Sequence, residues 1–177
     1  MTKIPAILLA ILIGVTFHAV YAEDIHITSE DYINTSFLNE PPKASVLWIK
    51  GDVKTEISKI LEHPYHKLRV KYWEKAGKTV WILDEIGKEK YITTGITINK
   101  QAQIEDIKVL SFRESRGWEV KHDFFTQQFK NIFKLPNTQL SEPIDGITGA
   151  TLSVNALKKQ ARMALYLHEI TQEKKVK

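Results

Sequence analysis

The chain has 177 residues, 43% of them hydrophobic, and a formal net charge of +4, which favours one globular domain with at most a short extension. The positive charge is spread along the chain and forms no basic groove, so a nucleic-acid-binding protein is excluded. The absence of cysteine excludes thiol catalysis, iron–sulfur clusters, cysteine-based zinc sites and covalently attached c-type haem. Any redox chemistry must therefore come from a cofactor held in another way.

The N-terminus has the pattern of an export signal. Lys3 gives a positive start, residues 4–15 form an uncharged apolar core, and Val20-Tyr21-Ala22 resembles a small-residue cleavage site. We therefore predict a signal peptide at residues 1–22 and a periplasmic or otherwise extracytoplasmic location for the rest. The uncharged stretch that ends at Ala22 is also long enough to span a bilayer, so retention as a membrane anchor is the alternative.

Residues 23–66 are predicted to form a helical extension of the main domain. Ser29 is placed to cap a first helix, which the prolines at 41 and 42 would stop. Asp52 is placed to cap a second helix, which ends near His63. Apolar residues recur at helical spacing in this second helix, at Val53, Ile57, Ile60 and Leu61.

The main domain, predicted at residues 67–170, begins with strand patterns. Residues 68–74 alternate between apolar and charged side chains, and residues 79–83 form the matching apolar strand after a glycine-containing turn, which is typical of a β-hairpin. Residues 91–98 and 104–112 predict a third and a fourth strand. The fold class is therefore predicted to be α+β, with a twisted antiparallel sheet and helices packed on it.

Two helical patterns follow the strands. The first has five residues on one face and ends before Pro136: Val120, Phe124, Phe125, Gln128 and Phe129. The second begins near Thr151, and its apolar stripe from Val154 to His168 predicts an amphipathic helix of about four to five turns. Residues 171–177 are rich in lysine and are predicted to be a solvated basic tail.

The most informative segment is Asp-Gly-Ile-Thr-Gly-Ala-Thr at residues 145–151. Its glycines, Gly146 and Gly149, permit a tight turn, and Thr148 and Thr151 place hydroxyls beside the free backbone N–H groups of a helix start. These donors and the helix dipole favour an anion such as phosphate. An ordinary helix cap is the alternative, because threonine is common in caps.

The pattern Asp-x-x-Thr-Gly-Ala-Thr resembles the flavinylation motif of the FMN-binding domain family. That family includes the periplasmic flavin subunits of sodium-pumping quinone reductase and of the Rnf complex, and this chain resembles a small stand-alone periplasmic branch. The resemblance extends over residues 68–169, with residues 113–119 similar to the Glu-x-x-Gly loop that borders the flavin. It implies the following cofactor-binding residues: Thr151, Asp145, Thr148, Gly149, Ala150, Glu114, Ser115 and Gly117.

The resemblance also implies how the cofactor is attached and used. FMN would be joined to Thr151 by a phosphodiester bond, made by a separate flavin transferase with FAD as donor. The protein would carry electrons between partners such as cytochromes or membrane electron-transport proteins. A flavin-dependent reductase subunit that acts directly on a small acceptor is one alternative. A non-redox exported binding module, in which the motif is only a turn and cap, is another.

Other residue patterns point to no second function. His63 and His66 are close in sequence, but no third ligand is in view, so a metal site is not predicted. His122 and His168 are predicted to lie at the helix surface or its boundary. Trp118 is predicted to belong to the core or a lid rather than to stack on the flavin ring. No Gly-x-Ser-x-Gly elbow is present, so a hydrolase has no support.

Overall fold

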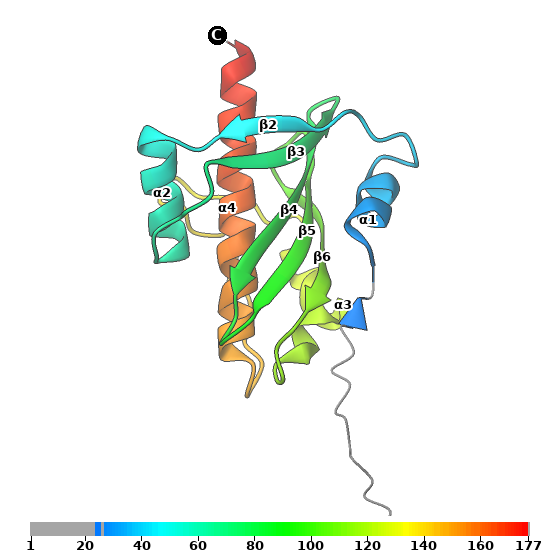
Figure 1. Cartoon of the computed structure of the whole chain (residues 1–177), viewed down its shortest axis with the longest axis vertical. Helices are drawn as coiled ribbons and strands as arrows, with labels where there is room; N and C mark the ends of the chain where they lie inside the picture. Colours follow the sequence, from blue (N-terminus) through cyan, green and yellow to red (C-terminus); the bar gives the residue numbers. More distant parts are fainter. Residues whose placement is uncertain (1–23, 26, 177) are drawn as a thin grey trace, which may run out of the picture.

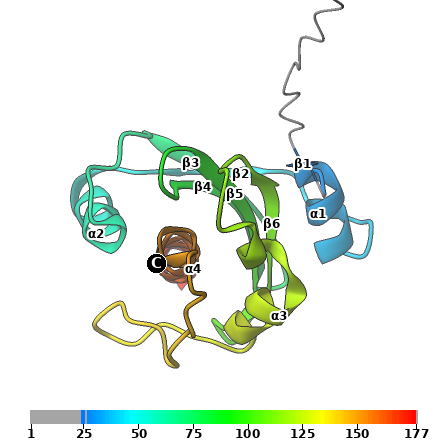
Figure 2. The same cartoon turned by 90° about the horizontal axis from the view of Figure 1, so that it is seen from below.

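The computed structural model describes residues 24–25 and 27–176, so the predicted signal peptide lies outside the described residues. Six antiparallel strands form one sheet in the order β1-β6-β5-β4-β3-β2. The sheet curves around helix α4, and helix α1 covers its other face (Figures 1 and 2). The fold is α+β, as predicted. The strands are β1 (Asp24–Ile25), β2 (Ser45–Trp48), β3 (Arg69–Lys75), β4 (Lys78–Ile86), β5 (Tyr91–Ile98) and β6 (Ile104–Phe112).

The helices lie on both faces of the sheet and at its ends. They are α1 (Ser29–Ser36), α2 (Gly51–Leu61), η1 (Trp118–Lys121), α3 (Asp123–Thr126), η2 (Gln127–Phe129) and α4 (Thr151–Val176), where η marks a 3₁₀ helix. No helix in the described part of the chain is both long and apolar enough to cross a membrane.

The predicted hairpin and the two strands that follow it are confirmed. Strands β3 and β4 are joined by Ala76 and Gly77, whose φ angles of 53° and 81° are those of a tight turn that matches the twist of the sheet. Strands β5 and β6 have the predicted bounds. Runs of strand-forming residues bounded by turn residues are sufficient to locate such strands.

The extension at residues 23–66 contributes strands as well as helices. Strand β1 pairs with β6 and strand β2 pairs with β3, so the extension completes both edges of the sheet. Neither strand is predicted from the sequence. In β2 only Leu47 is buried among four residues, which is too short an alternation to stand out.

The two predicted helix caps are wrong by one or two residues. Thr28, and not Ser29, caps α1, because its hydroxyl accepts the Asp31 N–H at 3.0 Å. Helix α2 follows Lys50 without a side-chain cap, and Asp52 lies in its first turn, where a carboxylate still favours the positive end of the helix dipole.

Helix α1 packs on the sheet through an apolar cluster and makes one especially close contact. The Tyr32 ring lies against Gly95 of β5, where an added Cβ would come within 2.4 Å of the ring. The Tyr32 hydroxyl lies 3.0 Å from Thr97 Oγ1, and burial raises the pKa of Tyr32 well above its usual value. A glycine in the middle of β5 is therefore needed to seat α1.

The helix predicted at residues 120–129 is instead three short pieces, η1, α3 and η2. The backbone is extended at His122, between η1 and α3. Residues before and after this break therefore do not share one continuous helical face. Val120, Phe125 and Phe129 are buried as predicted, but Phe124 is 64% exposed. A helical period read across the break assigns Phe124 to the wrong face.

Helix α4 is longer than predicted, with 26 residues, and it includes residues 171–176 of the predicted tail. Thr171 is buried and donates to the carbonyl of His168 at 2.7 Å. His168, predicted at the surface or boundary, is 2% exposed, and its Nδ1 lies 2.8 Å from Thr79 Oγ1 on β4. Burial lowers the pKa of His168 to about 4, so the ring is neutral at pH 7.

Candidate functional site

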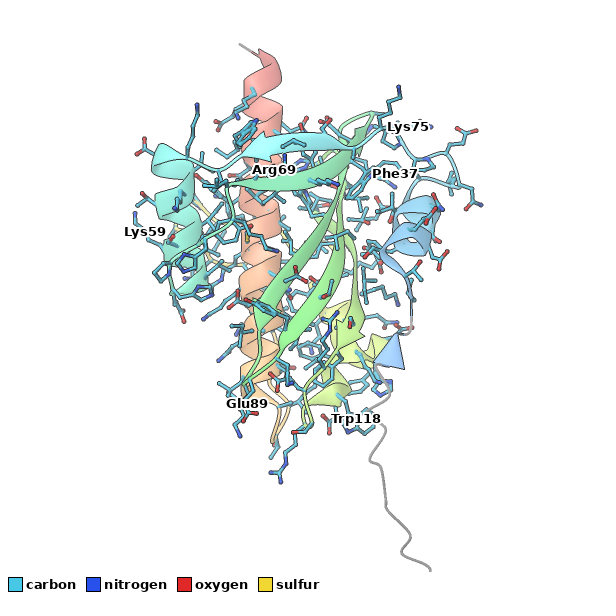
Figure 3. The ribbon with its side chains drawn as sticks, in the orientation of Figure 1. Phe37, Lys59, Arg69, Lys75, Glu89 and Trp118 are labelled. Atoms are coloured by element: carbon cyan, nitrogen blue, oxygen red, sulfur yellow. The ribbon has the colours of Figure 1, made fainter. Side chains whose placement is uncertain are left out.

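The motif lies at the end of the molecule where helix α4 begins, the lower end in Figure 1. Figure 3 labels Glu89, in the β4–β5 turn, and Trp118, after the loop that follows β6, at this same end. Three segments that are distant in sequence therefore meet here: residues 87–90, residues 113–118 and the motif at 145–151. We call this region the motif end.

The motif backbone forms a tight turn that leads directly into α4. The Ala150 N–H donates to the Ile147 carbonyl at 2.9 Å, and the Val154 N–H donates to the Ala150 carbonyl at 2.9 Å. Gly149, the third residue of this turn, has φ 84°, a conformation that favours glycine. Space is open on the side where a Cβ would stand, so the need for glycine is conformational.

Every third residue of the segment anchors it to the core. Ile144 and Ala150 are buried, and Ile147 packs on the same hydrophobic cluster. The Asp145 N–H donates to Gln128 Oε1 at 2.7 Å, which fixes the start of the motif. The sequence places Gln128 on an apolar helix face, and only the structure shows this role. The predicted site residues between the anchors, Asp145, Thr148, Gly149 and Thr151, are exposed.

Thr151 and Thr148 are both open to solvent, so exposure does not distinguish them. Their positions in the backbone do. Thr151 is the first residue of α4, beside amide N–H groups that have no acceptor within the helix, whereas Thr148 lies inside the turn. A phosphate on the Thr151 oxygen would lie at the positive end of a 26-residue helix.

The predicted loop at residues 114–117 is in direct contact with the motif. Gly117 is buried with φ 83°, and a Cβ added to it would lie 2.5 Å from Ser153 Oγ and 3.4 Å from the Ala150 Cβ. The glycine therefore allows the loop to close against the first turn of α4. Ser115 lies exposed in the same loop.

Glu114 holds the neighbouring turn. Its Oε1 accepts the backbone N–H groups of Lys88, Glu89 and Lys90 at 2.5, 2.8 and 2.9 Å. Partial burial alone would raise the pKa of this carboxyl, but the three hydrogen bonds together lower it. Glu114 therefore fixes the β4–β5 turn beside the motif through Oε1.

Residues 87–166 match the model of the FMN-binding domain family. The chain carries an FMN-binding domain. The protein is therefore an FMN-binding flavoprotein, and the match contains both the Glu114–Gly117 loop and the motif. A search of curated proteins and a search of solved structures each found no match. The matched residues begin at the β4–β5 turn, whereas the sheet that supports the FMN-binding domain continues through β4, β3 and β2.

The residues at the motif end fit FMN. The exposed Thr151 hydroxyl, the helix-start N–H groups and the open space around Gly149 can accommodate a phosphate and the chain attached to it. FMN supplies redox chemistry when it is bound, and the protein supplies its position and electrostatics.

The FMN-binding domain also presents an aromatic surface that the sequence does not predict. Trp118, assigned from sequence to the core or a lid, is 50% exposed, and Phe124 is 64% exposed. The exposed His122 joins them, with its ring centroid 5.1 Å from that of Trp118 and 6.0 Å from that of Phe124. We call these three side chains the aromatic surface. The sequence indicates this surface only through the closeness of the three residues to Gly117 along the chain.

A polar hollow of about 570 Å³ lies beside α4. Its helix residues include Asn155, Lys158 and Arg162, which follow Thr151 at helical spacing on one face. Glu62 pairs with Lys159 at 3.0 Å and with Arg162 at 4.0 Å, and the hydrogen bond from Lys159 lowers the pKa of Glu62. Two of the three cations in the hollow are thus already paired.

The histidines at 63 and 66 do not form a metal site with their neighbours. His63 contacts Glu85 at 2.9 Å through Nε2 and the Pro64 carbonyl at 3.1 Å through Nδ1. Burial alone would lower the pKa of His63, but the bond to Glu85 and the bond to the carbonyl raise it. Within residues 24–25 and 27–176, no group of three histidine, aspartate or glutamate side chains is arranged to hold a metal ion.

Proposed function

We propose that the FMN of this flavoprotein is joined by a phosphodiester bond to Thr151, and that the protein carries electrons outside the cytoplasmic membrane. The observation that supports the attachment is an exposed threonine hydroxyl at the first residue of α4, directly after the turn through Gly149, inside the family match. No other hydroxyl of the motif combines exposure with a place in the first turn of the helix, since Thr148 precedes it and Ser153 is buried.

The proposed attachment balances as a phosphoryl transfer. The Thr151 oxygen bonds to the phosphorus of the FMN half of FAD, the bond from that phosphorus to the bridging oxygen breaks, and AMP leaves. The hydroxyl proton passes to a base of the flavin transferase or to solvent. The resulting phosphodiester keeps one negative charge, which the N-terminus of α4 stabilises.

The carrier role rests on the openness of the motif end and on the value of a covalent tether. A flavin lost from an exported protein would diffuse away, whereas a tethered one stays. The motif end offers an exposed surface to a macromolecular partner, such as a cytochrome, and the polar hollow lies beyond it along α4. The family assignment favours this flavoprotein interpretation over a non-redox module.

Intact mass after co-expression with a flavin transferase tests the attachment. We expect wild-type protein to gain one FMN less one water and to stay yellow after denaturation. Thr151→Ala should lose the added mass completely and cost about 1 kcal/mol of stability at most, as the loss of a helix-start hydroxyl does. Thr151→Ser should retain part of the adduct because it keeps the hydroxyl.

Thr148→Ala is the matched control, because Thr148 is another exposed threonine three residues away. It can lower the yield by loosening the turn, but the adduct should stay at Thr151. An adduct mapped to Thr148 or Ser153 would contradict the residue assignment, and FMN that denaturation releases would contradict covalent attachment.

Two further measurements test the carrier role and the location. The purified flavoprotein should reduce small acceptors slowly when no protein partner is present, and rapid turnover of such an acceptor would favour the reductase alternative. N-terminal sequencing of protein from an extracytoplasmic fraction should begin at Glu23. Recovery of intact Met1 only in membranes would show an anchor.

A further inference from the structure

The aromatic surface is the feature of the motif end that the proposed attachment leaves unexplained. Trp118 and Phe124 are two of the large hydrophobic side chains that remain half or more exposed, and they lie on either side of one histidine ring. Isolated exposed apolar residues are common, but an exposed cluster with ordered ring contacts marks a contact surface. The surface is aromatic, so a flat ring system is the ligand that suits it.

The position of this surface relative to Thr151 is fixed by backbone packing. Gly117 lies directly against Ser153 and Ala150, at distances that exclude a side chain, and Trp118 is the next residue. Thr151 lies between Ala150 and Ser153 in sequence. The residue that would carry the flavin and the residue that presents the indole ring are therefore held by the same contact.

We propose that Trp118 stacks against the isoalloxazine ring of the FMN attached to Thr151, and that His122 and Phe124 extend this surface under the ring. The inference rests on the proposed attachment. In this arrangement the half-exposed indole covers one face of the flavin and leaves the other to a redox partner. Trp118 is then a positioning residue for the cofactor, and it would quench flavin fluorescence through close contact.

The polar hollow beside α4 is the rival place for the ring, because it opens on the face of the helix that carries Thr151. Its lining contains no aromatic side chain, and its residues are Glu62, Gln139, Leu140, Ser141, Glu142, Pro143, Ile144, Asn155, Lys158, Lys159 and Arg162. Of these two places, the aromatic surface is the one where a flat aromatic ring gains stacking. Lys158 lines the hollow, so the variant Lys158→Gln tests this rival place for the ring.

Flavin fluorescence and visible circular dichroism of the full-length flavinylated protein test the proposal. Intact mass first confirms that each variant carries FMN. The Trp118→Leu protein should emit severalfold more flavin fluorescence than wild type and lose the visible dichroism that a fixed ring produces. Trp118→Tyr should restore most of the quenching, because a tyrosine ring can occupy the same position. Since Trp118 is half exposed, these variants should fold normally.

Phe133→Leu is the matched control. Phe133 is 44% exposed, and its segment pairs with Gln103, which precedes β6, whereas Trp118 follows the loop at the other end of that strand. Phe133→Leu should leave fluorescence unchanged. Unchanged fluorescence in Trp118→Leu, or an increase in Lys158→Gln instead, would overturn the stacking proposal. Absence of the adduct in wild type would overturn the proposed attachment itself, so the two failures are distinguishable.

Discussion

The first two residues of helix α4 and the inner face of its later turns differ in exposure. Thr151 and Leu152 are exposed, and the helix-start N–H groups beside them have no acceptor within the helix. Farther along, polar side chains on the inner face are buried and bonded to the sheet. Gln160 donates to the carbonyls of Leu83 and Ile92 at 3.1 and 2.8 Å. One helix thus provides a fixed support at one end and an open chemical site at the other, which is how a precise site is built.

A pair of leucine substitutions should show the largest difference between the two parts of α4. Leu157 is fully buried and Leu152 is 50% exposed. Leu157→Ala should lower the free energy of unfolding by about 3 kcal/mol, through lost burial and a cavity. Leu152→Ala should change it by less than about 0.5 kcal/mol. Urea unfolding measures both, and equal losses would show that the first turn is packed as tightly as the rest.

The buried His168 should make stability depend on pH. Its pKa is about 4 in the folded protein, below the ordinary value of 6.5, so between these pH values the unfolded chain binds a proton that the folded protein does not. Stability contributed by neutral His168 is complete above pH 6.5 and is lost as pH falls towards 4, by up to about 3 kcal/mol.

Unfolding measured between pH 7 and pH 4.5 for wild type and His168→Asn tests this. The variant should be less stable at pH 7 but should lose less stability on acidification, because asparagine does not titrate. Parallel pH profiles for the two proteins would contradict the assignment. Thr151→Ala, at the open end of the same helix, should keep the wild-type profile.

Alanine substitutions at two glycines of the motif end should show separately how much backbone strain and how much steric crowding cost in stability. Gly149 and Gly117 have nearly equal φ angles of 84° and 83°, but only Gly117 is crowded, by Ser153 and Ala150. Gly149→Ala should cost about 1 kcal/mol for the left-handed conformation. Gly117→Ala should cost about 2 kcal/mol more, because an extra methyl group must displace packed atoms. Equal costs in thermal unfolding would show that the loop can move away from α4.

The sequence predicts those parts of the fold whose signal is local and repeated. Strands β5 and β6 follow from runs of strand-forming residues between turn residues, and α4 from a sustained helical stripe. It fails where an element is short or where the chain changes direction. Strand β2 has four residues and gains its stability from pairing with β3, and the break at His122 divides one apparent helix into pieces.

For the site, local residue patterns predict the motif, the turn through Gly149, and a threonine at the start of a helix, because turns and helix starts depend on neighbouring residues. The same patterns led to the FMN-binding domain family. The surroundings of that motif follow instead from the three-dimensional packing. The closure of Gly117 on Ser153, the use of Glu114 to hold a distant turn, and the exposure of Trp118 all depend on contacts between segments far apart in the chain. Such contacts leave no periodic pattern in the sequence, because each joins one pair of segments that are close only in the folded protein.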